Sequence, residues 1–333
     1  MAENINRRGF IQSGSTLAFA SLLSAELLAS IEDIPVSPFG FTTTADEVTT
    51  GIDLIGKTVL ITGCNSGLGY QSMKTIAARG AHVLGAARTM EKAANACDSV
   101  KGQTTPLVCE LADFDSVVAC ADVVQGLGMP LDVLMCNAGI MGLRKLEQVN
   151  GIERQFVVNH LGHFILTTRL LSQVEAAAEG RIVMVSSIGY QNAPKAGIEF
   201  NNLSGNRSYK PFTAYGQTKL ANALFAFELA RMYEGTSLSA NAIPPGLIAT
   251  NLARYITGKS RDPNEPLRKG FKTAEQGAAT QVYVATHPNL KGVSGYYFED
   301  CKPVVPTGLH MSDEILAAQL WAVSQALTAP YLS

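Results

Sequence analysis

From Lys57 onward the chain alternates between short apolar runs and segments of helical periodicity, and this alternation constrains the fold more than any other feature. Apolar strands that are buried on both faces need helices on each side, so the pattern predicts a mostly parallel sheet. Right-handed crossovers make such a sheet doubly wound. We therefore expect an α/β, Rossmann-type single domain with seven strands, whose ligand lies beyond the carboxyl ends of the strands.

The expected strands are Thr58–Thr62, His82–Ala87, Pro106–Leu111, Val133–Cys136, Arg181–Ser186, Leu238–Ile243 and Gly295–Phe298. The expected helices, one after each of the first six strands, are Gly67–Arg79, Met90–Cys97, Asp113–Gln125, Ile152–Leu171, Ala214–Tyr233 and Thr273–Thr286.

Composition argues against several classes of function. The net charge of −2 over 333 residues gives no electrostatic reason to expect nucleic acid or an anionic membrane as a partner. The six cysteines are scattered, so we interpret them as free buried thiols. His160 and His163 lie three residues apart but have no carboxylate or cysteine at ligand spacing, which favours packing or hydrogen bonding. We predict no metal site.

The N-terminus has a different character from the rest of the chain. Arg7 and Arg8 precede a mostly small and apolar run, Ser13–Ala29, which resembles a bacterial twin-arginine export signal. We expect a signal or anchor over residues 1–30, an irregular linker over 31–55 and a catalytic domain over 56–330. This predicts a periplasmic protein that touches a membrane only through an uncleaved N-terminus. The alternative is a short N-terminal helix on a cytoplasmic enzyme.

The first expected strand ends in a glycine-rich turn that opens into a helix. Gly63 permits the tight turn, Gly67 lets the backbone approach a pyrophosphate, and Gly69 allows close packing of helix and sheet. Exposed N–H groups at the start of the helix favour an anion. The position of the turn in an alternating chain therefore predicts a dinucleotide site.

Tyr215 and Lys219 lie four residues apart, so a helix places the phenol and the ammonium group on one face. A tyrosine cannot act as an acid or base near neutral pH without help, and a nearby positive charge favours the phenolate. The pair predicts proton exchange with an alcohol or a carbonyl.

The GxxxGxG spacing of Gly63, Gly67 and Gly69 resembles that of the short-chain dehydrogenase/reductase family. Further motifs agree in order and location over about residues 56–300. They are Cys136-Asn137-Ala138-Gly139, Val158–Phe164, Val185-Ser186-Ser187, Tyr215 with Lys219, and Pro244–Thr250. In the first of these motifs, Cys136 stands where the family has Asn. Four stretches are similar to the retinol-dehydrogenase-like branch of the family. They are the long segment Ile188–Phe212 and the shorter segments Asn159–Phe164, Thr273–Ala278 and Tyr297–Cys301.

The resemblance implies a catalytic tetrad of Asn159, Ser187, Tyr215 and Lys219. Tyr215 is the expected general acid/base, Lys219 lowers its pKa and reaches the nicotinamide ribose, and Ser187 donates a hydrogen bond to the substrate oxygen. Asn159, by its side chain or adjacent backbone, would hold a water that links Lys219 to solvent. Ser186 faces away from Ser187 because side chains alternate along a strand.

The same resemblance places the cofactor against residues from every strand end. The expected cofactor-binding residues are Gly63, Asn65, Ser66, Gly67, Leu68, Gly69, Arg88, Glu110, Leu111, Asn137, Ala138, Gly139, Asn159, Tyr215, Lys219, Gly246, Ile248 and Thr250. The second strand ends in Arg88 where NAD-specific sites carry a carboxylate, and a guanidinium pairs with a 2′-phosphate. We therefore expect NADP, with NAD as the alternative. Glu110 stands where the family usually has Asp.

The sequence thus predicts an oxidoreductase that moves hydride between nicotinamide and a carbonyl or alcohol. Loops 188–212 and 249–272 would line the substrate pocket. They carry Ile198, Phe200, Leu203, Tyr209 and Phe212 beside several basic residues, so a lipophilic or an acidic substrate remains open.

Two other classes remain as alternatives. A non-catalytic dinucleotide sensor has no need of the tyrosine, and an epimerase or dehydratase of the extended relatives prefers GxxGxxG. We expect a small-molecule substrate, which is an alcohol, an aldehyde or a ketone. We expect the chain to form a homodimer or to remain a monomer.

Overall fold

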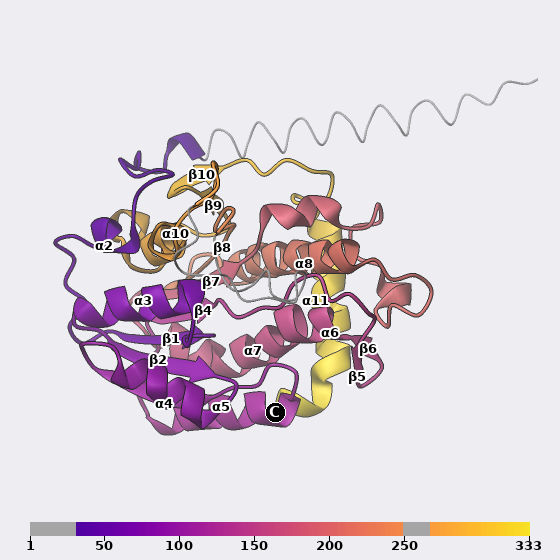
Figure 1. The fold of residues 1–333 in the computed structure, drawn as a ribbon, viewed down its shortest axis with the longest axis horizontal. Helices are drawn as coiled ribbons and strands as arrows, with labels where there is room; N and C mark the ends of the chain where they lie inside the picture. The colour runs from indigo at the N-terminus through magenta and orange to yellow at the C-terminus, as the bar shows by residue number, and fades with distance from the viewer. Residues whose placement is uncertain (1–30, 249–266) are drawn as a thin grey trace, which may run out of the picture.

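An eight-stranded sheet forms the centre of the protein, with helices on both faces (Figure 1). The computed structural model describes residues 31–248 and 267–333. The strands are β1 (Thr58–Thr62), β2 (His82–Ala87), β3 (Thr104–Val108), β4 (Val133–Cys136), β7 (Gly180–Val185), β8 (Leu238–Ile243), β9 (Tyr297–Glu299) and β10 (Lys302–Val304), with a separate small pair β5 (Gln148–Val149) and β6 (Ile152–Glu153).

The helices are α2 (Ala45–Val48), α3 (Gly67–Ala78), α4 (Met90–Asp98), α5 (Phe114–Gly126), α6 (Arg154–Phe156), α7 (Gly162–Glu175), α8 (Pro211–Met232), α10 (Ala274–Thr286) and α11 (Glu314–Thr328). A π-helical turn, η1 (Val157–Leu161), joins α6 to α7. Short 3-10 turns are η2 (Ile188–Asn192), η3 (Phe200–Asn202), η5 (Pro288–Leu290) and η6 (Ala329–Tyr331).

The strand order is β10-β9-β8-β7-β4-β1-β2-β3. Within this sheet all neighbouring strands described pair parallel, except that β10 is antiparallel to β9. The chain builds outward from β1 through β2 to β3, and then from β4 through β7 to β8 on the other side. The crevice between the carboxyl ends of β1 and β4 is therefore the topological switch point, where ligands of open α/β sheets bind.

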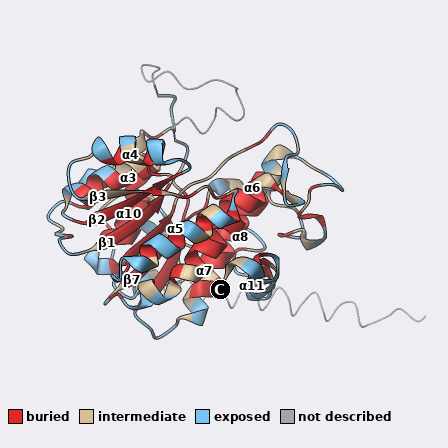
Figure 2. Cartoon of the chain, turned by 90° about the horizontal axis from the view of Figure 1, so that it is seen from below, coloured by how far each residue is buried: buried red, intermediate tan, exposed pale blue. Residues whose placement is uncertain are grey.

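Strand alternation divides the apolar core between the two faces of the sheet. Along β1, Leu60 packs in the cluster under α5, α7 and α8, whereas Val59 and Ile61 pack under α3 and α10. Figure 2 shows the buried residues concentrated on the strands and the inner sides of the helices. All six cysteines are free and buried in this core, as the sequence predicts.

The predicted doubly wound, mostly parallel sheet is confirmed, but the expected number of seven strands is wrong. The eighth strand, β10, has only three residues and includes Pro303, which cannot donate to a ladder. An edge strand tolerates proline, yet so short a strand leaves no periodic signal. The third strand also begins earlier than expected, at Thr104 rather than Pro106. The strand expected over Gly295–Phe298 is β9 and runs over Tyr297–Glu299.

The helix expected over Ile152–Leu171 is interrupted. Its first residues form β6, and the remainder passes from α6 through the π-helical turn η1 into α7. Helical periodicity does not distinguish a π turn from an α-helix, because only one extra residue is inserted.

The C-terminal helix α11 was not predicted. It packs along α8, where Trp321 contacts Phe225 and Phe164 at ring-centroid distances of 5.7 and 5.1 Å. Exposed apolar residues such as Ile315, 83% exposed, blur its amphipathic pattern.

The expected linker over residues 31–55 packs onto the domain. Its helix α2 has a capping box between Thr44 and Glu47, and it lies against α10. No helix within residues 31–248 and 267–333 combines the length and the apolarity needed to cross a bilayer.

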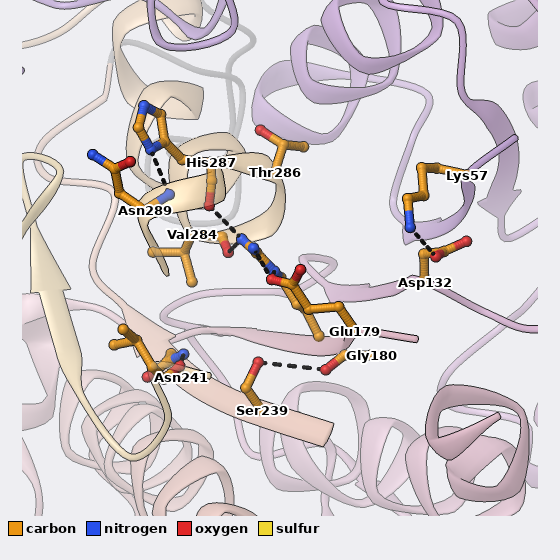
Figure 3. Close-up of polar contacts among 12 residues, drawn as sticks. Lys57, Asp132, Glu179, Gly180, Ser239, Asn241, Val284, Thr286, His287 and Asn289 are labelled. Atoms are coloured by element: carbon orange, nitrogen blue, oxygen red, sulfur yellow. Dashed lines mark hydrogen bonds and ion pairs between the residues drawn. The ribbon is translucent and has the colours of Figure 1, made fainter. Parts of the chain in front are cut away.

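At the amino ends of the strands, charged groups are paired within the protein (Figure 3). Lys57 Nζ lies 2.8 Å from Asp132. The Arg181 guanidinium pairs with Glu179 and donates to the carbonyls of Val284 and His287 at 3.1 and 3.0 Å, which satisfies the last turn of α10. This edge of the sheet is therefore occupied by internal contacts, whereas the opposite edge carries the glycine turns.

Candidate active site

The turn after β1 is held open by glycines. Gly63 and Gly67 have positive φ angles of 71° and 55°. A Cβ on Gly69 would lie 2.3 Å from the Gly63 carbonyl oxygen and 2.5 Å from Asn137 Nδ2, so only glycine fits there. The turn thus brings the start of α3 against the end of β4.

The start of α3 has the properties of an anion site. Its N-cap residue, Ser66, makes no side-chain capping hydrogen bond, and the first turn carries no acidic residue. The backbone N–H groups there and the helix dipole favour a phosphate. Asn65 and Ser66 are exposed, and Leu68 packs beside Gly277 of α10.

Arg88 follows β2 directly, one residue before Thr89 caps α4. Its side chain is exposed, and within the described part of the chain it makes no hydrogen bond or ion pair. Arg88 is therefore available to an anionic ligand rather than serving as a cap of the loop.

Glu110 and Leu111, which follow β3, differ in how deeply they are buried. The Glu110 carboxylate accepts from the Ala112 N–H at 3.2 Å and stays half-buried. Leu111 is only 3% exposed and packs against Gly162, where a Cβ would lie 2.6 Å from the Leu111 carbonyl oxygen. Leu111 therefore belongs chiefly to the core.

The end of β4 is tied to the end of β1. Asn137 Nδ2 donates to the Thr62 carbonyl at 2.8 Å, and the backbone N–H groups of Asn137 and Ala138 both donate to Thr62 Oγ1 at 3.0 Å. Asn137 Oδ1 also accepts from Gln281 at 3.3 Å. The Asn137 side chain thus joins two strand ends, and it leaves Ala138 and Gly139 to wall the crevice.

Asn159 and Lys219 converge next to Gly139. A Cβ on Gly139 would lie 3.2 Å from Asn159 Oδ1 and 3.6 Å from Lys219 Nζ. Asn159 is fully buried in the π-helical turn. Its Oδ1 accepts from the Ile140 N–H at 2.8 Å, and its Nδ2 donates to the Ile140 carbonyl and Thr218 Oγ1 at 2.9 and 3.0 Å.

This arrangement restricts how Asn159 could hold the expected water. Both Nδ2 hydrogens are used within the protein, so the side chain fixes the segment and has no donor left for a water. A water would have to donate to Oδ1, which has a second lone pair, or bond the adjacent backbone.

Ser187 and Tyr215 converge next to Gly189. A Cβ on Gly189 would lie 2.9 Å from Tyr215 Cε1 and 3.2 Å from Ser187 Oγ. Ser187 Oγ also accepts from the Gly189 N–H at 3.0 Å. Ser186 points into the core, where its hydroxyl donates to the Lys219 carbonyl at 2.7 Å. The choice of Ser187 over Ser186 therefore agrees with the direction of the two side chains.

The acid–base properties of Tyr215 and Lys219 are set mainly by burial. Burial raises the pKa of Tyr215, and a hydrogen bond with Ser187 opposes the rise. Burial lowers the pKa of Lys219 to about 8. Lys219 Nζ lies 5.7 Å from the Tyr215 ring centroid and donates to the Val185 carbonyl at 2.9 Å. The lysine thus does not dominate the pKa of the phenol in the protein alone.

The segment after β8 meets α10. Gly246 has a positive φ of 91°, and Ile248 forms an isolated parallel bridge with Lys272. A Cβ on Gly277 would lie 2.5 Å from Ile248 Cδ1 and 2.7 Å from Leu68 Cδ2, so both apolar side chains meet α10 beside the crevice. Thr250 and most of the expected lid, 249–272, lie outside the described residues.

The loop over residues 188–212 folds some of its apolar side chains inward. Ile198 and Leu203 are 3% and 8% exposed and pack in the core, and the Tyr209 hydroxyl donates to the Leu143 carbonyl at 2.6 Å. That the loop lines the substrate pocket stays a prediction. Phe212 is 48% exposed.

Comparisons with known proteins identify the family. The short chain dehydrogenase family matches residues 57–261. Short-chain dehydrogenase TIC 32 B of Brassica napus is 39% identical, over 86% of this chain and 93% of that protein. Retinol dehydrogenase 14 of Mus musculus is 38% identical, over 82% of this chain and 86% of that protein.

The solved structures agree with the sequence relatives. The crystal structure of an uncharacterised protein from Mycobacterium paratuberculosis has a TM-score of 0.67 and 33% identity, and it covers 87% of this chain and 98% of that one. The chain belongs to the short-chain dehydrogenase family, and its relatives include retinol dehydrogenases. It is an oxidoreductase with the NAD(P)-binding fold of that family, which confirms the predicted class.

Proposed function

We propose that the protein is an NADP(H)-dependent dehydrogenase or reductase in which Tyr215 exchanges a proton with the oxygen of a carbonyl or alcohol substrate. The observation that supports it best is the double convergence at the switch point. Ser187 and Tyr215 meet beside Gly189, and Asn159 and Lys219 meet beside Gly139.

The residues divide the work between them. Bound at the Gly63–Gly69 turn, the nicotinamide cofactor supplies the hydride chemistry. Tyr215 gives its proton to the substrate oxygen during reduction, and the raised pKa keeps the phenol protonated near neutral pH. Ser187 donates to the same oxygen as negative charge develops. We assign to Lys219, whose Nζ lies 5.7 Å from the Tyr215 ring centroid, the return of a proton to the phenol.

The preference for NADP rests on Arg88, whose guanidinium has no partner among residues 31–248 and 267–333 and can bind a 2′-phosphate. Changing Arg88 to Ala should weaken NADPH binding by roughly 10- to 100-fold, since a charge-assisted hydrogen bond contributes about 1.5–3 kcal/mol. NADH binding should change by less than about threefold, because NADH lacks that phosphate.

Fluorescence titration of both cofactors measures the effect. Lys74→Ala is the matched control, because it also removes an exposed positive charge, from α3. An equal loss of NADH and NADPH affinity in Arg88→Ala would contradict the assignment.

We propose that the substrate is lipophilic, because relatives include Retinol dehydrogenase 14 and because Phe212 is exposed near the start of α8. A screen of NADPH and NADH consumption over aliphatic, aromatic and terpenoid aldehydes tests both proposals together. Turnover confined to charged or strongly polar aldehydes would argue against a lipophilic pocket.

We propose that residues 1–30, which lie outside the described residues, direct export by the twin-arginine route. That route carries folded proteins, so the cofactor could travel inside the enzyme. Expression of wild type beside an Arg7→Lys, Arg8→Lys double variant should give periplasmic protein only from wild type. Equal retention of both in the cytoplasm would dismiss the export proposal.

A further inference from the structure

His163 connects the two halves of the site, although it is not one of the expected catalytic residues. It lies in the first turn of α7 and is fully buried. Its Nε2 lies 2.9 Å from Thr62 Oγ1, at the end of β1, and its Nδ1 lies 3.0 Å from the carbonyl oxygen of Asn159, in the π-helical turn.

These contacts determine which ring nitrogen carries the proton. A carbonyl oxygen only accepts hydrogen bonds, so Nδ1 must be the donor to Asn159. The Thr62 hydroxyl already accepts two N–H groups, from Asn137 and Ala138, and both of its lone pairs are therefore used. Its single hydrogen is left to donate to Nε2, since the Met135 carbonyl is farther away at 3.4 Å. Both contacts therefore require the Nδ1–H tautomer of His163.

The imidazole keeps this tautomer because it stays neutral. Burial lowers the pKa of His163 to about 4, the hydrogen bond to the Asn159 carbonyl opposes the fall, and the charge of Lys219 adds to it. At neutral pH the ring therefore has one donor and one acceptor, each matched to its partner.

We propose that His163 is a positioning residue, which fixes the backbone of Asn159 and ties it through Thr62 to the strand end that walls the cofactor crevice. This inference rests on the proposed function. The Asn159 side chain is already held by Ile140 and Thr218. With the carbonyl held as well, the π-helical turn has one conformation beside Gly139 and Lys219, and a cofactor seated on Ala138 and Gly139 meets a fixed catalytic segment.

Loss of both contacts should misplace that segment. His163→Phe should lower kcat/KM by roughly 10- to 100-fold, because small displacements of catalytic groups have effects of this size. His82→Phe is the matched control, because it also removes an imidazole that bonds a threonine hydroxyl. His82 begins β2, at the amino ends of the strands and opposite the crevice, and its Nε2 lies 2.8 Å from Thr105 Oγ1. The kcat/KM of folded His82→Phe should stay within about threefold of wild type.

A second pair of variants separates positioning from packing. His163→Asn places an amide N–H near the Nδ1 position and can keep the donor to Asn159, whereas His163→Gln reaches toward Thr62 and loses it. Positioning predicts that the Asn variant retains more kcat/KM than the Gln variant. Packing predicts the opposite order, because Gln leaves the smaller cavity.

The tautomer itself is measurable without turnover. In the full chain labelled with ¹⁵N in its histidine rings, the His163 resonance, assigned by its loss in His163→Phe or in the Asn variant, should show a protonated Nδ1 and a bare Nε2. A proton on Nε2, or Gln retaining more activity than Asn, would overturn the proposal. If the wild-type protein reduces no carbonyl at all, the proposed function fails. The tautomer of His163 can still be measured, and so can the NADPH affinities of His163→Asn and His163→Gln. These two measurements then decide whether His163 positions the crevice.

Discussion

Changing Tyr215 to Phe should lower kcat by roughly 10²- to 10⁴-fold, the contribution typical of a positioned general acid or base. The ring and its packing remain, so the site keeps its shape beside Gly189. NADPH should still bind with an affinity within about threefold of wild type, because the phenol hydroxyl is required for proton transfer rather than for binding the phosphates. Stopped-flow turnover and fluorescence titration measure the two quantities.

Tyr283→Phe is the control for loss of a buried phenol hydroxyl. Tyr283 is 1% exposed and lies in α10, where it contacts Phe39 and His287. Its loss should leave kcat unchanged. A Tyr215→Phe variant that turns over normally for each bound cofactor would remove the acid–base assignment and favour a binding protein that senses the dinucleotide.

Changing Gly69 to Ala should abolish measurable NADPH binding. The new Cβ would lie 2.3 Å from the Gly63 carbonyl oxygen and 2.9 Å from its carbonyl carbon, closer than van der Waals contact allows. Because backbone cannot yield as a side chain can, the turn or the start of α3 must move. Overpacking of this kind costs about 1–3 kcal/mol of stability, and it displaces the N–H groups that would bind the pyrophosphate.

Gly126→Ala is the matched substitution. Gly126 ends α5, and a Cβ there would meet nothing within 4 Å. This variant should fold, bind NADPH and gain up to about 1 kcal/mol, since alanine favours helix more than glycine does. Thermal denaturation with and without NADPH compares the two proteins. A Gly69→Ala variant whose melting temperature rises with NADPH as much as that of wild type would show that the turn does not seat the cofactor.

Much of the scaffold could be predicted because it depends on local patterns. Apolar runs such as Val133–Cys136 predicted strands, and the glycines at 63, 67 and 69 predicted a strand–turn–helix. The strand β10 and the helix α11 could not be predicted in the same way. β10 is too short to show a period, and α11 is stabilised by distant residues such as Phe164 and Phe225.

The polar details of the site depend on residues far apart in the sequence. Asn137 was expected at the cofactor, but its side chain joins the ends of β1 and β4 and contacts Gln281 of α10. The motif Val158–Phe164 includes His163, but it does not report the contact with Thr62, which is 101 residues away. Sequence patterns identify which residues reach a strand end, but tertiary contacts decide which of their atoms remain free.

The expected effect of Lys219 on the pKa of Tyr215 also depends on tertiary contacts that the sequence does not report. Spacing places the ammonium group one helical turn from the phenol, but it does not report that both groups are buried. Burial favours the neutral form of each, so the pKa of Tyr215 rises while that of Lys219 falls to about 8.

We propose that Ser187 and Tyr215 act on the oxygen of one carbonyl group, with Lys219 supporting Tyr215, while the carbon of that group takes hydride from the nicotinamide. Transfer of deuterium from NADPH labelled at C4 tests it most directly, with an aldehyde that the screen identifies as a substrate. We predict that the label appears on the carbinol carbon of the product from one face of the nicotinamide only, and that Tyr215→Phe stops its transfer. Product that carries no deuterium, or deuterium arriving equally from both faces, would contradict the account.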